Sequence, residues 1–131
     1  MKLQKLNPNH IIEPFNNAYH HSVVIPPNSR ILHTSGQIGL RPDGSISDDP
    51  AEQADQMWFN LMACIEEAKM GPDDIVKITA YLVNLSDYQC FASARTKYLG
   101  DCRPASTAIL VKGLVKPEWR FEVEAVAASA V

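Results

Sequence analysis

Two glutamates near the carboxyl end of the chain, Glu122 and Glu124, are separated by a single residue in a segment with strand-like alternation. Side chains two positions apart in a strand point to the same face of a sheet, so this spacing predicts a carboxylate pair. If that face is buried between copies of the chain, desolvation and mutual repulsion favour protonation of one carboxyl, which makes a proton carrier near neutral pH. On a solvated edge the same pair has no chemical role.

Two other segments place small polar residues at predicted strand ends. Residues 34–37, Thr-Ser-Gly-Gln, put the Ser35 hydroxyl beside Gly36, where a backbone or a ligand can approach closely. An ordinary β-bulge is the alternative interpretation of this segment. Residues 103–108, Arg-Pro-Ala-Ser-Thr-Ala, place Ser106 and Thr107 at the start of a strand. We expect this polar cluster and the carboxylate of Glu122 to face one cleft.

The histidines and cysteines form no recognisable metal or nucleophile motif. His21 and His33 could approach each other across a predicted hairpin, but no third ligand has a metal-like spacing. Cys64, Cys90 and Cys102 are an odd set without a CxxC pair, which favours reduced thiols. Cys102 lies beside the predicted cleft, yet no partner base supports a nucleophilic role. The sequence therefore predicts neither a metal nor a cofactor.

The length of 131 residues suits a single domain that spans residues 1–131. The net charge is −3, and the twelve Lys and Arg residues are scattered, so the basic surface typical of nucleic-acid binding is missing. No run approaches the ~18 apolar residues of a membrane span, and the first residues do not form a secretory signal. We expect a cytoplasmic protein whose partners are small molecules, without a membrane.

Alternating apolar residues and turn signals predict five strands, at residues 19–25, 30–38, 75–85, 107–111 and 119–128. One more short strand is expected near the amino terminus. Residues 26–29, Pro-Pro-Asn-Ser, favour a turn, so the first two of these strands are predicted to form a hairpin.

Two helices are predicted between the strands. Asp49 is placed to cap the first helix, with Pro50 in its first turn and Glu52 at the capping-box position. Apolar residues at three- and four-residue spacing follow for about twenty residues, until residues 71–72, Gly-Pro, end the pattern. A second capping box at residues 86–89 predicts a shorter helix that ends at Leu99, before a glycine.

These helices can cover only one face of a mixed sheet of five to six strands. Apolar residues occur in more strands than two helices can shield: Val23, Ile25, Ile78, Ala80 and Val123. We therefore expect copies of the chain to associate through the uncovered face. A monomer with one solvated face is the alternative.

Taken together, the motifs resemble the reactive intermediate deaminase (RidA, formerly YjgF) family over residues 13–128. The resemblance is carried by residues 19–23 (Tyr-His-His-Ser-Val), 34–38 (Thr-Ser-Gly-Gln-Ile), 104–105 (Pro-Ala) and 121–125 (Phe-Glu-Val-Glu-Ala). It implies a chorismate-mutase-like α+β fold and a homotrimer whose sheets line a central barrel, with three clefts between neighbouring subunits.

Members with the full motif hydrolyse reactive enamines and imines to keto acids and ammonia without a cofactor. By position, the resemblance implies that Tyr19, Ser35 and Gly36 line the cleft. Glu122 and the Gly36 carbonyl would hold and activate a water molecule. The Ala108 amide would face the substrate carboxylate.

The chain departs from the family pattern at Ser106, where active members carry an arginine that clamps the substrate carboxylate. Loss of such a charge-assisted contact costs at least about tenfold in binding. Ala92 stands where the family often has asparagine. Arg95 or Arg103 could supply a substitute cation, and solvation of Arg95 at the surface is the alternative.

Three functions follow from these residues. The leading hypothesis is a trimeric imine or enamine hydrolase with an altered substrate range. A second is a trimer without catalytic activity that binds a metabolite or stabilises other proteins. A third is an endoribonuclease, an activity attributed to some relatives, against which the acidic charge balance argues.

Overall fold

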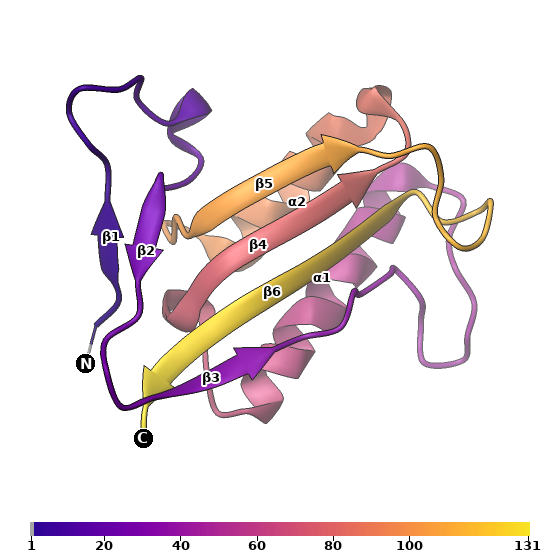
Figure 1. Cartoon of the computed structure of the whole chain (residues 1–131). Helices are drawn as coiled ribbons and strands as arrows, with labels where there is room; N and C mark the ends of the chain where they lie inside the picture. Colours follow the sequence, from indigo (N-terminus) through magenta and orange to yellow (C-terminus); the bar gives the residue numbers. More distant parts are fainter. Residues whose placement is uncertain (1) are drawn as a thin grey trace.

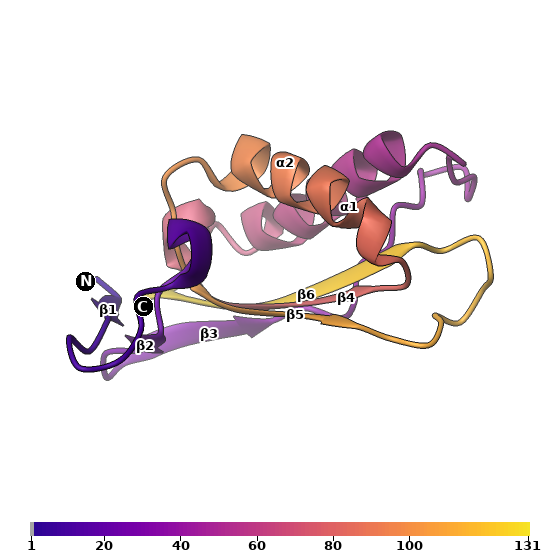
Figure 2. The same ribbon diagram turned by 90° about the horizontal axis from the view of Figure 1, so that it is seen from above.

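Two α-helices pack side by side on one face of a four-stranded sheet, as Figure 1 and Figure 2 show. The computed structural model describes residues 2–131. The helices are α1 (Pro50–Glu67) and α2 (Tyr88–Leu99). The strands are β1 (Gln4–Leu6), β2 (Ser22–Val24), β3 (Ser29–His33), β4 (Ile75–Leu82), β5 (Ala105–Leu110) and β6 (Phe121–Ala130). Single 3₁₀ turns are η1 (Phe15–Asn17), η2 (Pro72–Asp74) and η3 (Leu85–Asp87). The predicted α+β class with two helices on one face is confirmed.

The four-stranded sheet has the order β3-β6-β4-β5. β6 pairs antiparallel with both β3 and β4, whereas β5 runs parallel to β4 because α2 forms the crossover between them. β5 is consequently an edge strand with one side free of β-pairing in the protomer. The expected extra strand near the amino terminus is present as β1. The single sheet of five to six strands that we predicted is not formed, because β1 and β2 pair only with each other and leave a sheet of four strands.

The predicted hairpin between residues 19–25 and 30–38 is wrong. β2 pairs with β1 in a separate two-stranded sheet, and β3 pairs with β6. In the connection, Pro26 and Pro27 have no amide donor for a tight hairpin turn, while Asn28 adopts a positive φ of 62°. The long strand β6 offers β3 a five-residue antiparallel register instead.

Helix α1 begins where the sequence predicts, because the Asp49 carboxylate accepts a hydrogen bond from the Glu52 amide and Pro50 occupies the first turn. The Glu52 carboxylate accepts from the Ser47 hydroxyl, so it does not complete a capping box. The helix ends at Glu67, earlier than predicted, since Lys69 takes a positive φ of 62° before the chain reaches the Gly-Pro pair.

Helix α2 ends as predicted, with Gly100 at a φ of 58° after Leu99. The capping box predicted at its start is wrong, because no side chain caps this helix. The buried carboxylate of Asp87 instead accepts from the Arg120 guanidinium at 3.0 Å. That ion pair ties the start of α2 to the segment that leads into β6.

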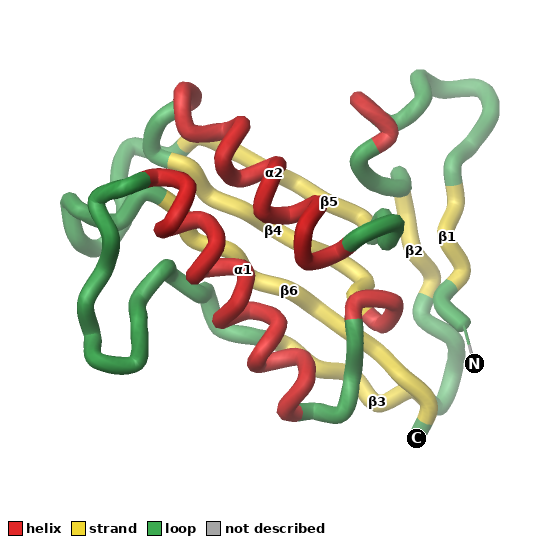
Figure 3. The backbone as a smooth tube through the Cα atoms, turned by 180° about the vertical axis from the view of Figure 1, so that it is seen from behind, coloured by secondary structure: helices red, strands yellow, loops and turns green. Residues whose placement is uncertain are grey.

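The core lies between the two helices and the sheet, as Figure 3 shows from the helix side. From α1 it contains the predicted stripe of Ala54, Met57, Trp58, Leu61 and Ile65, all with no exposed surface. Burying these apolar side chains is the main stabilising contribution to such a domain.

Three of the apolar residues that we expected the two helices to leave uncovered lie in the core instead. Ile78, Ala80 and Val123 are 0–1% exposed and belong to the helix-covered core, because they sit at the alternate positions that face α1 and α2. The opposite, open face carries their neighbours in sequence, including Thr79 and Glu124. The open face is thus more polar than predicted.

No helix among residues 2–131 is long and apolar enough to cross a membrane.

Candidate functional site

The carboxylate of Glu122 lies directly against the backbone of Gly36. A Cβ atom placed on Gly36 would sit 2.7 Å from the Glu122 Cδ and would overlap its Oε2 atom. Only glycine therefore admits the carboxylate in this position. No hydrogen bond or ion pair from residues 2–131 engages the half-buried Glu122 side chain, so its oxygens can accept from a ligand or a water molecule.

Strand β6 positions Gly36 through its flanking residues. The Thr34 amide donates to the Ala125 carbonyl, and the Ala125 amide donates to the Thr34 hydroxyl oxygen, both at 3.0 Å. Gln37 exchanges two backbone hydrogen bonds with Val123, at 2.7 and 3.0 Å. Gly36 is held between these two attachments, next to Glu122. The carbonyl of Ser35 accepts from the Gln37 side chain at 3.4 Å.

Glu124, the second acid of the predicted pair, has a hydrogen-bond partner in the protein. Glu124 lies on the open face beside Glu122, and its Oε1 accepts a hydrogen bond of 2.7 Å from the Tyr81 hydroxyl. This bond raises the pKa of Tyr81, with smaller contributions from partial desolvation and from the charges of both glutamates. Of the two acids on this face, Glu124 is hydrogen-bonded to Tyr81, whereas the carboxylate oxygens of Glu122 have no partner among residues 2–131 and are free to bind a ligand or water.

Ser106 and Thr107 lie on opposite faces of β5. Thr107 pairs with Thr79 and shares the open face, where its hydroxyl accepts from the Lys77 ammonium at 2.7 Å. Ser106 pairs with Ile78 and shares the helix-covered side, as does Ala108, which pairs with Ala80. Alternation along the strand forces this division.

Within one protomer, Ser106 and Glu122 are well separated. Strand β4 lies between β5 and β6, so the two residues are two strand spacings apart, or about 10 Å. Their β4 partners are Ile78 and Tyr81, which adds an offset of three residues, about another 10 Å, along the sheet. The predicted polar cluster and the predicted acid thus do not meet in a single copy of the chain.

Tyr19 lies at the amino-terminal side of β2, where its hydroxyl oxygen accepts from the Phe15 amide at 3.2 Å. Its ring stands edge-on to the ring of His21, with 5.8 Å between centroids. The neighbouring His20 amide donates to the Pro104 carbonyl, which links this segment to the start of β5. Tyr19 is therefore anchored beside the β5 edge strand.

Arg95 and Arg103 line one cavity of about 210 Å³ between α2 and η1. Its other lining residues are Asn16, Asn17, Ala18, Tyr88, Gln89, Ala92, Thr96, Leu99, Gly100 and Cys102. Arg103 donates to the carbonyls of Asn17, Gly100 and Cys102, at 2.7–3.0 Å, and so fastens η1 to the end of α2. Ser106 is absent from this lining.

Cys102 sits in the same cavity wall with its thiol turned to Asp73, whose Oδ1 accepts the Sγ hydrogen bond at 3.0 Å. Burial, this hydrogen bond and the Asp73 charge raise the pKa of the thiol to about 11. A thiol with that pKa is protonated at neutral pH and is a poor nucleophile. Cys102 thus has the properties of a structural residue.

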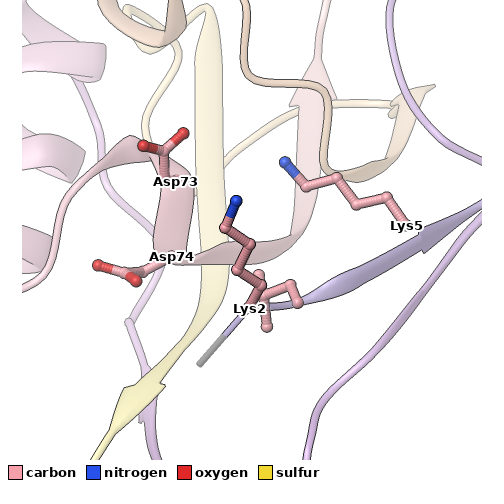
Figure 4. Close-up of a pocket in the computed structure, with 5 residues that line it drawn as sticks. Lys2, Lys5, Asp73 and Asp74 are labelled. Carbon is pink, nitrogen blue, oxygen red and sulfur yellow. The ribbon is translucent and has the colours of Figure 1, made fainter.

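A separate cavity of about 460 Å³ is lined in part by Asp73. Figure 4 shows the ammonium groups of Lys2 and Lys5 and the carboxylates of Asp73 and Asp74 around it. Both signs of charge are present, and the predicted site residues are elsewhere. Among residues 2–131, no group of three or more His, Cys, Asp or Glu side chains could hold a metal ion.

Sequence reasoning missed Tyr81 as the partner of Glu124 and Lys77 as the partner of Thr107. Both stand at the outward positions of the predicted β4 strand, so their face could be read from the alternation. Their proximity to Glu124 and Thr107 depends on the strand order, which places β4 between β5 and β6. No local pattern carries that information.

Comparison with known proteins gives a consistent assignment. The model of the family described as Endoribonuclease L-PSP matches residues 11–129. A RutC family protein from Pyrococcus abyssi is 33% identical over 98 residues, which is 73% of this chain and 76% of the relative. A human protein named 2-iminobutanoate/2-iminopropanoate deaminase is 32% identical over 100 residues, 75% of this chain and 72% of the relative.

Similarity of structure extends over the whole fold. The crystal structure of a protein of the conserved Rid family from Yersinia pestis matches with a TM-score of 0.86 at 26% identity, covering 98% of this chain and 100% of that one. The family match, the identities above 30% and this fold agree with the motifs around Gly36 and Glu122. The chain therefore belongs to the endoribonuclease L-PSP family, the family of the RidA and YjgF proteins.

Proposed function

We propose that the protein hydrolyses small imines and enamines to carbonyl compounds and ammonia. The observation that carries the proposal is the contact between Gly36 and Glu122, which leaves a half-buried carboxylate without a protein hydrogen-bond partner among residues 2–131. Membership of the L-PSP family and the human relative named for imine deamination support the same reaction class.

The chemistry needs one positioned water molecule and one proton carrier. Glu122 accepts a proton from water as the oxygen bonds to the imine carbon, and it passes that proton to the imine nitrogen, which gives a tetrahedral aminoalcohol. Glu122 then accepts the alcohol proton and delivers it to the amino group as the carbon–nitrogen bond breaks, which releases ammonia and forms the carbonyl group. An enamine enters the same sequence after a proton has moved from its nitrogen to its carbon, which gives the imine. Glu122 ends in its starting state, and the sum is one imine plus one water giving one carbonyl compound plus one ammonia.

The site is proposed to lie between two copies of the chain. Glu122 and Gly36 belong to the open face, while Ser106 and Ala108 belong to the covered side of an edge strand two strands away. A second copy could bring these two groups together, and the exposed Ile31 and Ile109 give the open face apolar contacts for self-association. We propose a homotrimer, with a solution mass of three 14.5 kDa protomers.

The substrate range is proposed to differ from that of relatives with an arginine at the Ser106 position. A serine hydroxyl can donate one hydrogen bond but supplies no charge for a substrate carboxylate. Imines that are uncharged or larger are therefore better candidate substrates than the smallest imino acids.

The test compares two neighbouring acids by measuring ammonia release from freshly generated 2-aminoacrylate and from neutral imines. We expect Glu122→Gln to lower kcat/KM by at least about a hundredfold on whichever imine is turned over, because the proton acceptor is lost. Glu124→Gln is the matched control and should change kcat/KM by less than about fivefold, since the Glu124 carboxylate accepts a hydrogen bond from Tyr81.

Equal rates for wild type and Glu122→Gln would reject the assignment of Glu122. Absence of ammonia release from every imine, together with retained binding of ketones or carboxylates, would favour a metabolite-binding protein instead. A solution mass of one protomer would reject the site between copies.

A further inference from the structure

We infer that two amide side chains of helix α1, Gln53 and Asn60, hold Gly36 against Glu122 and so act as positioning residues for the proposed hydrolysis. Both side chains act on the backbone segments that carry Gly36 and Glu122, and neither is proposed to touch the substrate. The effect on the reaction rate rests on the proposed function, whereas the contacts themselves are made within a single protomer.

Asn60 clamps the segment that follows Gly36. Its Nδ2 atom donates two hydrogen bonds, one to the Ile38 carbonyl and one to the Leu40 carbonyl, both at 2.8 Å. Its Oδ1 atom accepts a hydrogen bond from the Gln56 side chain at 2.9 Å. Both hydrogens of the amide nitrogen are therefore used, and the half-buried side chain has one defined orientation.

Gly39 lies between these two carbonyls and rests directly on α1. A Cβ atom added to Gly39 would overlap the backbone oxygen of Gln53 and would lie 2.9 Å from the Gln53 Cγ. Glycine therefore permits a close approach of the two backbones. On the opposite side, Gln37 exchanges two backbone hydrogen bonds with Val123 of β6. The stretch that follows Gly36 is thus held between α1 and β6.

Gln53 holds the segment that leads into Glu122. Its side chain is 1% exposed, and its Oε1 atom accepts from the amide of Arg120 at 2.6 Å, two residues before Glu122. Its Nε2 atom donates to the carbonyls of Ser47 and Glu118, at 2.9 and 3.2 Å. A buried amide with three such bonds keeps one orientation, because leaving any of these groups unpaired is costly.

Helix α1 links the two clamps. Gln53 and Asn60 are seven residues apart, close to two helical turns, so they lie on the same side of the helix and about 10 Å apart along its axis. Trp58 and Leu61 fix the helix to the core, since neither has any exposed surface. The helix therefore helps to set the position of Gly36 relative to Glu122. A misplacement of about 1 Å in a catalytic site can cost about a hundredfold in rate.

The experiment is a double-mutant cycle that measures ammonia release from whichever imine the protein hydrolyses. Asn60→Ala should lower kcat by about tenfold and change KM by less than about threefold, because the groups that bind the substrate remain. In the Glu122→Gln background, the same substitution should change kcat by less than about twofold, since the proton acceptor is already gone. A merely structural role would lower kcat by the same factor in both backgrounds.

Amide hydrogen exchange gives a second measurement that needs no substrate. Asn60→Ala should speed up exchange of the Gln37 amide, which donates to the Val123 carbonyl, by at least about tenfold. The amides of β4 should change by less than about threefold, because the core beneath them is intact. Absence of imine hydrolysis would reject the proposed function, and the exchange rates would still decide whether Asn60 holds this segment.

Two further variants complete the experiment. Glu66→Ala is the matched control, because it truncates an exposed side chain of the same helix that has no hydrogen bond or ion pair among residues 2–131. Its kinetics and exchange rates should equal those of the wild type. Gln56→Ala removes only the bond that orients Asn60, so it should lower kcat by about threefold. This milder change keeps the test available if Asn60→Ala does not fold.

Three outcomes would overturn the inference. The first is an equal loss of kcat from Asn60→Ala with and without Glu122→Gln. The second is equal acceleration of exchange for the Gln37 amide and the amides of β4. The third is wild-type kinetics in Asn60→Ala while Glu122→Gln is impaired, which would leave the proposed function standing without this pair of positioning residues.

Discussion

The two faces of the four-stranded sheet are built from the same strands but carry different kinds of side chain, apolar on one face and mainly polar on the other. Toward the helices, β4 and β6 present Ile78, Ala80 and Val123, all at most 1% exposed. On the open face, the alternate positions present polar groups, such as Tyr81 bonded to Glu124 and Lys77 bonded to Thr107. One face holds the fold together, and the other carries groups that can do chemistry.

This division explains why the candidate site can tolerate polar, half-buried groups. The stability of the protomer comes mainly from the apolar layer under α1 and α2, so the open face is not required to supply it. An unpartnered carboxylate at Glu122 is thereby compatible with a stable domain. The predictions below test the separation between the faces, beginning with the largest expected effect.

Truncation on the covered face should be far more costly than truncation on the open face. We expect Ile78→Ala to lower the free energy of unfolding by about 2–5 kcal/mol, because Ile78 has no exposed surface and a cavity would remain. The adjacent, half-buried Thr79→Ala should cost less than about 1 kcal/mol. Denaturant unfolding at one fixed protomer concentration measures both. Similar losses would contradict the division of faces.

A methyl group on Gly36 should damage activity while leaving the fold intact. In Gly36→Ala the new Cβ takes the space of the Glu122 carboxylate, which must move. We expect imine hydrolysis to fall by about a hundredfold, with a stability change below about 1 kcal/mol. Gly113→Ala is the control, because nothing lies within 4 Å of the added Cβ there. Unchanged kinetics in Gly36→Ala would separate Glu122 from the reaction.

An arginine at Ser106 tests whether the covered side of the β5 edge takes part in the same cleft as Glu122. If a second copy brings them together, Ser106→Arg should raise kcat/KM for 2-aminoacrylate by at least about tenfold through contact with the substrate carboxylate. Rates for a neutral imine should not rise. The ratio of the two rates is the measurement, and an unchanged ratio would mean that Ser106 lies outside the cleft.

The smallest effect concerns the hydrogen bond between Tyr81 and Glu124. Because this bond raises the pKa of Tyr81 in the folded state, its contribution to stability is present below the ordinary value of 10.0 and is lost as pH rises through the folded pKa. The difference in unfolding free energy between wild type and Tyr81→Phe should therefore shrink above about pH 10. The other tyrosines cancel in this difference. A constant difference up to about pH 11.5 would contradict the bond.

Local signals predicted much of the covered face and its helix. The Asp49 cap and the stripe that includes Trp58 and Leu61 were sufficient to locate α1, since capping and 3.6-residue periodicity act within a few residues. The cap expected for α2 failed because Asp87 pairs with Arg120, which is distant in sequence. The hairpin failed for the same kind of reason, because β3 pairs with β6.

Part of the candidate site was also predictable. Alternation alone indicated that Glu122 and Glu124 share a face, and the motif pointed to Gly36. Their different roles were not predictable, because Tyr81 reaches Glu124 from another strand and the Gly36 backbone reaches Glu122 from another segment. The contact of Arg95 with the Phe91 ring and the bonds of Arg103 to backbone carbonyls also became apparent only in the tertiary structure.

By itself, the amino-acid sequence determined the helix and strand segments, the inward positions of each and the pairing of two acids on one face, because these follow from short-range periodicity and capping. The tertiary structure decided which strands pair, which of the two acids keeps free oxygens and which apolar residues the helices cover. Those outcomes depend on contacts between residues tens of positions apart, and such contacts form only when the whole chain has packed.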